Sequence, residues 1–446
     1  DKQANSLIAQ RLVQEITFVR VTGTAGDDSL ELDFSDGFVS PIDIRFDGGD
    51  GADTVTLSGA TLDAVTLSIS GEGSADIKMS DVSHTLSLSL TGTEAVHDQN
   101  TATDRLYSDA TTHGQNIRIQ DNSGSTADNI GTIAGDGLLA YTFTAETGTI
   151  TVDAGVGDDD IALESLDTGL AGRVLLSGGA GTDAVTGPPV DLTWTVTGEN
   201  AGEVAGVSFV SVETLIAADT EDVFVVQAGG SLSGGLDGGT GGFDTLVFDG
   251  GSFQSVEYLA YDLHSGVITR DGVSLNYAGL EPINDNSDAA NRVIDLSSMS
   301  DTAEITQDGT GLHITPSLFG ITIPPNIPAG LTFETVNIAT LPTESLTINL
   351  GDSADFQGDA IPFLSRDKVT ISGPVDLGNI HLTIDGQGDK DQVVIAGDLT
   401  VGDLTVNAEI IDVTGSITAN IETVGSHTST GTVTLNALAE DDGVIV

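Results

Sequence analysis

The sequence has no cysteine, few basic residues, few aromatics and no long apolar run. Without cysteine, no disulfide can hold the fold together. Lys and Arg number 13 in 446 residues against 68 Asp and Glu, which gives a formal net charge of −55. A charge of this sign argues against DNA, RNA and anionic membrane surfaces as partners. No apolar run approaches the roughly 20 residues that span a bilayer, so we expect no membrane insertion.

The chain is instead rich in small apolar residues, glycine and acid. Aromatic residues make up 4% of it, but apolar residues reach 39% and glycine contributes 56 residues. This apolar share is too high for a disordered acidic tail, so small and β-branched side chains must form the core. The chain begins at Asp1 without Met, and we expect a mature product or a fragment. Cations are the natural counterpart of the charge, which would also suit a salty medium.

Glycine- and aspartate-rich turns run directly into alternating apolar strands at residues 47–59, 177–187, 237–246 and 385–393. The first two match the pattern Gly-Gly-x-Gly-x-Asp-x-apolar that is typical of calcium-binding β-rolls, and the other two depart from it. Glycine permits positive φ and close backbone approach, so carbonyl oxygens and carboxylates can converge on a hard cation. Asp-Gly is also ordinary turn chemistry with solvated carboxylates, and this alternative stays open.

Aspartates followed within two residues by Leu, Ile or Val recur along residues 17–280, among short period-two strands. They are Asp28, Asp53, Asp76, Asp104, Asp128, Asp160, Asp183, Asp222 and Asp244. Several of the steps between them suit one coil of a parallel β-helix, and the longer steps suit coils with an inserted loop. Stacked carboxylates about 4.8 Å apart would repel each other unless a cation or water lay between them. We expect ions most directly at Asp28/Asp53 and Asp160/Asp183.

These patterns predict an all-β fold, a right-handed parallel β-helix or β-solenoid with acidic Gly/Asp turns, in one or two segments. Apolar residues at three- and four-residue steps over 3–16 favour a short helix that would cap the first coil. The predicted organisation is an N-terminal extension or helical cap (1–19), a first solenoid segment (20–281), a proline-containing loop or irregular coils (282–344) and a second solenoid segment (345–446).

Gly26-Asp27-Asp28-Ser29-Leu30, followed 25 residues later by Gly51-Ala52-Asp53-Thr54-Val55, resembles the large repetitive bacterial surface proteins with haemolysin-type (RTX-like) calcium-binding repeats, as do residues 345–352 and 404–414. The chain departs from them in lacking tandem nonapeptides. The resemblance implies secretion to the cell surface, bound Ca²⁺ and a role in adhesion, surface layers or filaments. The expected Ca²⁺ ligands are Asp28, Asp47, Asp50, Asp53, Asp158, Asp160, Asp183, Asp237, Asp244, Asp385, Asp389 and Asp391.

We therefore expect an extracellular structural protein that associates with itself head-to-tail or laterally, with surface polysaccharide as a further candidate partner. The enzymatic alternative is a polysaccharide lyase or epimerase, whose basic groove would need Arg105, Arg118, Arg173 and Arg270 on one face. A third class is an ice- or carbohydrate-binding module built from threonine rows, but the threonine spacing drifts along the sequence. The seven histidines are dispersed, so we expect no zinc site. Because the sequence has no Gly-x-Ser-x-Gly elbow, no phosphate-binding loop and no cysteine, we do not expect an enzyme.

Overall fold

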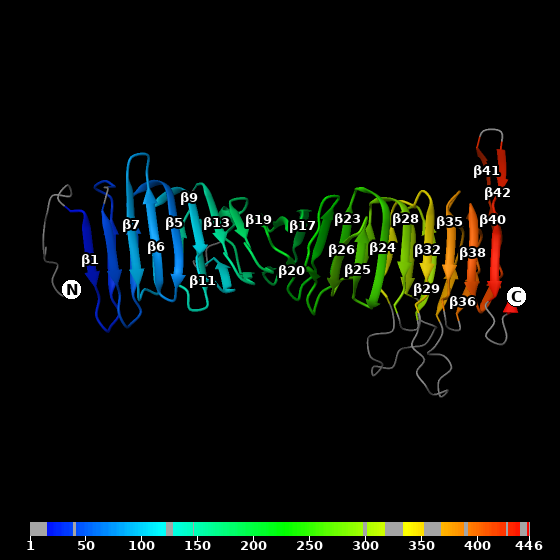
Figure 1. Ribbon diagram of the computed structural model, residues 1–446, viewed down its shortest axis with the longest axis horizontal. Helices are drawn as coiled ribbons and strands as arrows, with labels where there is room; N and C mark the ends of the chain where they lie inside the picture. The colour runs from blue at the N-terminus through cyan, green and yellow to red at the C-terminus, as the bar shows by residue number, and fades with distance from the viewer. Residues whose placement is uncertain are drawn as a thin grey trace, which may run out of the picture. The chain divides into compact units, whose positions relative to one another are not determined.

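The computed structural model describes residues 16–38, 42–121, 128–145, 147–297, 301–316, 333–351, 367–387, 391–424, 427–437 and 444–445. These residues are mostly β-strand, and none of them is in an α-helix (Figure 1). The all-β class is therefore confirmed. The helix expected over 3–16 lies outside the described residues except for its last position, and so does Asp389. No described helix is long and apolar enough to cross a membrane.

The chain forms two compact units. Unit 1 comprises residues 1–189 and 201–215, and unit 2 comprises residues 190–200 and 216–446. Within each unit, successive strands alternate between two long, mainly parallel sheets, which is consistent with a solenoid-like fold. We call one strand of each sheet, with the turn that joins them, a rung.

Unit 1 begins with rungs that pair in register. Strand β1 pairs with β3, and β3 with β7, while in the other sheet β2 pairs with β4, and β4 with β8, all parallel. Two antiparallel meanders, β5–β6–β7 and β10–β11–β12, interrupt this parallel stacking. The strands are β1 (Phe18–Thr22), β2 (Ser29–Asp33), β3 (Asp43–Asp47), β4 (Thr54–Ser58), β5 (Thr61–Gly71), β6 (Ser74–Ser80), β7 (Thr85–Thr91), β8 (Ala95–Asp98), β9 (Thr101–Asp109), β10 (Asn116–Gln120), β11 (Ile130–Gly135), β12 (Ala140–Thr144), β13 (Thr149–Asp153), β14 (Asp160–Leu163), β15 (Val174–Ser177), β16 (Ala184–Thr186), β18 (Ala201–Val204), β19 (Val207–Val210) and β20 (Thr214–Ile216). A short 3₁₀ helix, η2 (Thr168–Leu170), precedes β15.

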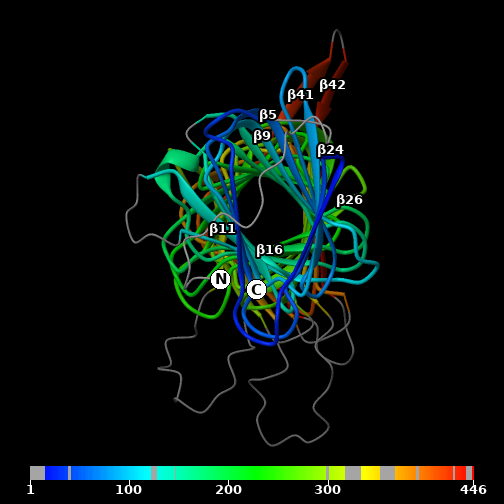
Figure 2. The same cartoon turned by 90° about the vertical axis from the view of Figure 1, so that its left-hand side faces the viewer.

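Unit 2 has the same mixture of parallel runs and antiparallel insertions. One parallel run is β24–β28–β32–β35–β38–β43, and another is β29–β33–β36–β39–β44. The β41–β42 hairpin projects from the sheets of this unit in both views (Figures 1 and 2). The strands are β17 (Thr193–Gly198), β21 (Val223–Gln227), β22 (Gly235–Asp237), β23 (Thr245–Asp249), β24 (Ser252–Asp262), β25 (Ser265–Arg270), β26 (Val273–Ala278), β27 (Ile283–Asp285), β28 (Asp288–Asp295), β29 (Thr302–Asp308), β30 (Gly311–Pro316), β31 (Val336–Ile338), β32 (Ser345–Asn349), β33 (Lys368–Ile371), β34 (Val375–Asp376), β35 (His381–Asp385), β36 (Gln392–Ile395), β37 (Leu399–Val401), β38 (Asp403–Ala408), β39 (Ile410–Val413), β40 (Ile417–Ala419), β41 (Ile421–Val424), β42 (His427–Thr430), β43 (Val433–Ala437) and β44 (Val444–Ile445).

The core of each unit consists of columns of apolar side chains, one from each rung. Because side chains alternate between the two faces of a strand, a period-two pattern turns every second residue inward. In unit 1, Val55 lies in register between Leu30 and Val96, and its side chain is fully buried. In unit 2, Ile348 lies between Ile294 and Ile384 and is equally buried. The alternation visible in the sequence therefore builds the core.

The described part of residues 282–344 corrects the expectation of loop or irregular coils. It contains strands β27 to β31, and β27 pairs in parallel with β23 and β31. Pro282 precedes β27 and Pro316 ends β30, so neither proline interrupts the interior of a strand. A proline at a strand end leaves the ladder intact because no interior N–H is removed.

Candidate cation sites

The double-glycine turns are corners where the backbone of one rung lies directly on the next. In the turn after β3, Gly49 and Gly51 have φ of 101° and 133°, which favours glycine. A Cβ on Gly51 would lie 2.8 Å from the carbonyl carbon of Gly26 in the preceding rung. In the turn after β15, a Cβ on Gly181 would lie 1.9 Å from the carbonyl oxygen of Gly157. Stacking of the rungs alone thus requires these glycines, whether or not an ion is bound.

The aspartate that ends each of these turns bonds to the rung before it. The Asp28 N–H donates to Asp53 Oδ1 at 2.6 Å, and the Ala52 N–H donates in the opposite direction to Asp27 Oδ1 at 2.9 Å. Each rung thus offers one carboxylate and one N–H to its neighbour. We call this pair of bonds a reciprocal clamp. Hydrogen bonds to a carboxylate are among the strong ones in proteins, so the clamp stabilises the stacked corner.

The reciprocal clamp recurs in both units. In unit 1 it joins Asp158 and Asp159 to Thr182 and Asp183, and in unit 2 it joins Asp191 and Leu192 to Glu221 and Asp222. At other rungs a glutamate takes the place of the corner aspartate. The backbone N–H groups of Asp53, Asp183 and Asp391 donate to Glu94, Glu213 and Glu409, respectively. In the sequence, Glu213 and Glu409 each lie in an apolar-Glu-apolar phrase, at residues 212–215 and 408–411, and this phrase is the local signal for such a glutamate.

The strand register confirms part of the predicted aspartate column and corrects the rest. Asp28 stacks with Asp53, and Asp222 with Asp244, whose Oδ1 accepts from the Asp222 N–H at 2.7 Å. The predicted pair Asp160/Asp183 is wrong, because Asp160 pairs with Ala184 and is exposed, whereas the buried Asp159 meets Asp183.

Asp76 and Asp104 were also predicted as corners. They lie instead inside strands β6 and β9 with exposed side chains. Strand β6 is antiparallel to β5 in the first meander, and β9 pairs in parallel with β5. Spacing along the chain cannot tell such an insertion from an ordinary rung, because both return a strand after a similar number of residues.

The remaining predicted ligands lie at or beside turns, and the bonds of Asp237 and Asp385 are local, whereas Asp158 bonds across rungs. Asp158 Oδ1 accepts from the Thr182 N–H, Asp237 Oδ1 from Gly239 and Asp385 Oδ1 from Gln387, while Asp47 ends β3 and Asp50 is exposed. Among the described residues, two groups of three acidic or histidine side chains bring their ligand atoms within 4.8 Å of one another. Neither group contains a predicted ligand, so calcium at those residues stays a prediction.

Burial gives some corner aspartates an electrostatic cost. It raises the pKa of Asp159 to about 6, although the hydrogen bond that Asp159 accepts from the Gln115 N–H lowers this pKa. It raises the pKa of Asp244 to about 6 as well, against the bond from Asp222. In addition, within the described part of the chain Oδ2 of Asp53 and of Asp183 is buried and accepts no hydrogen bond. The clamp thus satisfies only one oxygen of these two carboxylates.

The first of the two groups, Asp121, Asp128 and Asp167, centres on a carboxylate that already has donors. Asp167 accepts from the backbone N–H groups of Asp128, Asn129 and Gly169. Burial raises its pKa, but these hydrogen bonds outweigh burial and lower it overall. Asp167 therefore fits a structural role as the cap of η2.

The second group, in unit 2, joins His264, Glu281 and Glu334. His264 follows β24 in a tight turn in which its N–H donates to Asp262 Oδ1 at 3.0 Å. Glu281 lies just before β27, and Glu334 lies one rung further on, at the position that the register of β27 and β31 aligns with Glu281. His264 Nδ1 is 3.3 Å from Glu281 Oε2 and 3.5 Å from Glu334 Oε1.

Glu334 is the residue of this group whose environment is unusual. Its side chain is 1% exposed, and among the described residues neither of its carboxylate oxygens accepts a hydrogen bond. Burial raises its pKa to about 9, and the carboxylates of Glu281 and Asp262 act in the same direction. In the sequence, Glu334 lies in the same kind of apolar-Glu-apolar phrase, at residues 333–336. The phrase does not reveal the two partners of Glu334, because they come from other parts of the chain.

The arginines on which the enzymatic alternative depends make contacts within their own units. Arg105 is buried and bonds to Asp98, Arg118 is exposed beside Asp136, and Arg173 bonds to the carbonyl oxygen of Gly148. Arg270, in the other unit, is buried with its guanidinium 4.5 Å from the ring centroid of Phe248. The buried arginines therefore serve internal contacts.

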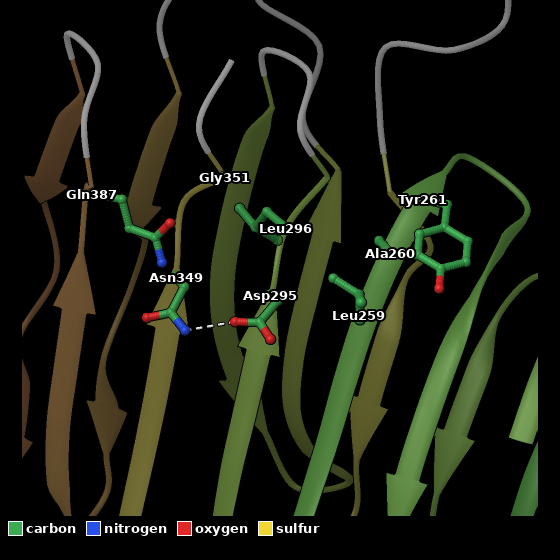
Figure 3. A pocket seen from close by; sticks show the side chains of 8 residues that line it. All are labelled: Leu259, Ala260, Tyr261, Asp295, Leu296, Asn349, Gly351 and Gln387. Atoms are coloured by element: carbon green, nitrogen blue, oxygen red, sulfur yellow. Dashed lines mark hydrogen bonds between the residues drawn. The ribbon is translucent and has the colours of Figure 1, made fainter. Parts of the chain in front are cut away.

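A groove of about 600 Å³ runs across β24, β28, β32 and the end of β35 (Figure 3). Its described lining consists of Leu259, Ala260, Tyr261, Asp295, Leu296, Asn349, Gly351 and Gln387. Asp295 is the acidic residue in this lining, and it accepts a hydrogen bond from Asn349 Nδ2 (Figure 3). This lining holds no pair of carboxylates to serve as acid and base.

Threonines do line up on one sheet of unit 2, contrary to the drift seen in the sequence. Thr347, Thr383, Thr405 and Thr434 are successive register partners in β32, β35, β38 and β43. The column two residues further on holds Asn349, Asp385, Asn407 and Asn436. The threonines thus form a single column of four, and the neighbouring column consists of asparagine and aspartate.

A comparison with protein-family models and one with curated proteins found no match to this sequence.

Proposed function

We propose that this chain is an extracellular structural protein, a right-handed, calcium-stabilised β-solenoid that forms or joins a cell-surface layer, filament or adhesive stalk. The observation that carries the proposal is the reciprocal clamp, which ties successive rungs together through paired carboxylate and N–H groups. A device repeated from rung to rung stabilises an extended stack without shaping an individual site. The right-handed crossover follows from the general preference for that hand in parallel β connections.

The negative charge of the chain is the reason for including calcium in the proposal. The chain carries a formal charge of −55, and buried corner carboxylates such as Asp159 and Asp244 have raised pKa values. A divalent ion near the acidic turns would lower the repulsion between stacked carboxylates. Exposed turn residues such as Asp50 are accessible to such an ion.

The internal positions of Arg105 and Arg270 support a structural role over a polysaccharide-cleaving one. An enzyme that binds acidic glycans would present basic side chains to its substrate, and these two are occupied by contacts within their units. Release of unsaturated sugars from alginate or pectin by the purified protein would nevertheless decide for the enzyme.

Calcium stabilisation is tested by thermal unfolding of the purified chain with millimolar Ca²⁺ and with chelator. We expect chelation to lower Tm by several degrees, because an ion that binds only the folded state adds ligand linkage. Sodium chloride at matched ionic strength is the control. Full recovery of Tm with sodium alone would reduce the calcium effect to general screening.

Assembly is tested separately, by light scattering and electron microscopy over a range of protein concentrations. We expect calcium to promote head-to-tail or lateral polymers. A chain that stays monomeric with Ca²⁺ at high concentration would rule out the surface-layer and filament roles.

A further inference from the structure

We propose that His264, Glu281 and Glu334, none of which is a predicted calcium ligand, form a binding site for a zinc-type divalent cation. Their ligand atoms all lie within 4.8 Å of one another, and they come from three different positions of unit 2. A zinc site at these residues would run against the expectation that dispersed histidines exclude zinc. The fold brings one histidine to two glutamates that are distant in sequence.

The spacing of the donor atoms fits a small tetrahedral ion. Two ligands that each lie roughly 2.0 to 2.1 Å from tetrahedral zinc are about 3.3 Å apart. His264 Nδ1 lies 3.3 Å from Glu281 Oε2 and 3.5 Å from Glu334 Oε1. One imidazole and two carboxylates also form a donor set that zinc accepts, whereas calcium prefers oxygen ligands throughout.

Glu334 is the independent indication that a ligand belongs here. A carboxylate that is 1% exposed and accepts no hydrogen bond from any described residue leaves a large desolvation cost uncompensated. Its nearest oppositely charged group would be a protonated His264, which Glu281 shares. A divalent cation between the three side chains would neutralise both glutamates and give Glu334 a direct ligand bond.

An ion can reach the site. A pocket of about 110 Å³, lined in part by Asp244, His264, Glu281 and the glycines of the turn after β22, opens beside the histidine. His264 and Glu281 are each partly exposed, at 42% and 32% of their side chains, while Glu334 forms the buried wall. This arrangement leaves an open coordination position for water, as in zinc sites with three protein ligands.

The test is Zn²⁺ binding to the full chain by isothermal titration calorimetry, in excess Ca²⁺ so that the acidic surface is already occupied. Zn²⁺ should bind with a stoichiometry of one. Glu334→Gln and His264→Ala should each weaken this binding by at least about tenfold, since even loss of an outer-shell partner typically costs about 10–100-fold. His381→Ala is the matched control, because His381 of the same unit also faces a carboxylate, Asp403, at 2.8 Å.

A second measurement separates binding from folding. Zn²⁺ should raise the Tm of the wild type and of His381→Ala but not that of Glu334→Gln, whose fold in chelator is checked by circular dichroism. Equal Zn²⁺ binding by the wild type and Glu334→Gln would overturn the proposal, as would the lack of a stoichiometric site in the wild type. Because calcium is in excess throughout, failure of the calcium proposal would not produce these results.

Discussion

Asp53 allows the reciprocal clamp to be separated from calcium ligation by two substitutions at one position. Its side chain is fully buried, and its Oδ1 accepts the Asp28 N–H at 2.6 Å. Asp53→Ala removes this acceptor and leaves the N–H of a stacked corner without its partner. Asp53→Asn keeps an acceptor oxygen in the same place, removes the charge and replaces the unbonded Oδ2 by an amide NH2 group.

The magnitude follows from the bond that is lost. A hydrogen bond to a charged group contributes roughly 1.5–3 kcal/mol, so we expect Asp53→Ala to lower the free energy of unfolding of unit 1 by about 2–3 kcal/mol. For a unit of this size that corresponds to a Tm lower by roughly 4–12 °C. Asp53→Asn should lower the free energy of unfolding by less than half of this amount, because it keeps the acceptor oxygen and removes a buried charge.

The assay is thermal unfolding followed by circular dichroism, first in chelator and then with Ca²⁺. In chelator the clamp alone predicts a low Tm for Asp53→Ala and a Tm close to the wild type for Asp53→Asn. Asp50→Asn is the control, since Asp50 is exposed and is a predicted calcium ligand outside the clamp. An unchanged Tm for Asp53→Ala in chelator would refute the clamp. Loss of the calcium-induced Tm rise in Asp53→Asn would identify Asp53 as a calcium ligand as well.

Two further predictions concern buried charge in unit 2. Arg292 and Asp285 are both fully buried and bonded to each other, so Arg292→Met should destabilise the unit by about 3–5 kcal/mol in urea unfolding, and adding Asp285→Asn should recover part of this loss. An equal or larger loss in the double variant would contradict the pairing. Burial raises the pKa of Asp301 to about 7, although the hydrogen bonds from Ser297 act in the opposite direction. The unfolded state therefore loses this proton at a lower pH than the folded state, and the free energy of unfolding falls as pH rises from about 4 through 7. Asp301→Asn should therefore raise the Tm at pH 8 relative to the wild type and lose this advantage near pH 4. A gain independent of pH would show that Asp301 does not titrate in this range.

The buried arginines also show an internal repeat that spacing along the sequence did not reveal. Arg105 bonds to Asp98 and to the carbonyl oxygen of Asn100, and Arg292 bonds to Asp285 and to the carbonyl oxygen of Ser287. In both units a buried tyrosine hydroxyl, from Tyr141 and Tyr258 respectively, donates to the same aspartate. The arginine follows the aspartate by seven residues each time. Two such networks, with the same spacing and the same kinds of partner, are what a duplication within the chain would produce.

Local pattern determined the class of fold and the chemistry of the turns. Alternation of apolar and polar residues, as in Thr54–Ser58, specifies which face of a strand is buried, since the backbone alone fixes a period of two. The glycines around Gly49 and Gly51 mark corners because only glycine readily adopts their positive φ. These properties depend on neighbours in the chain, so the sequence was sufficient to predict them.

Register and long-range partnership were decided only by the tertiary structure. A shift of one residue moves a side chain to the opposite face, which is why Asp159 and not Asp160 meets Asp183. The antiparallel meanders return a strand at nearly the spacing of a rung, which placed Asp76 and Asp104 wrongly. His264 and Glu334 are 70 residues apart and meet through a turn and a neighbouring rung. No local pattern predicts that these two side chains are neighbours, because their proximity depends on the length of each segment inserted between successive rungs.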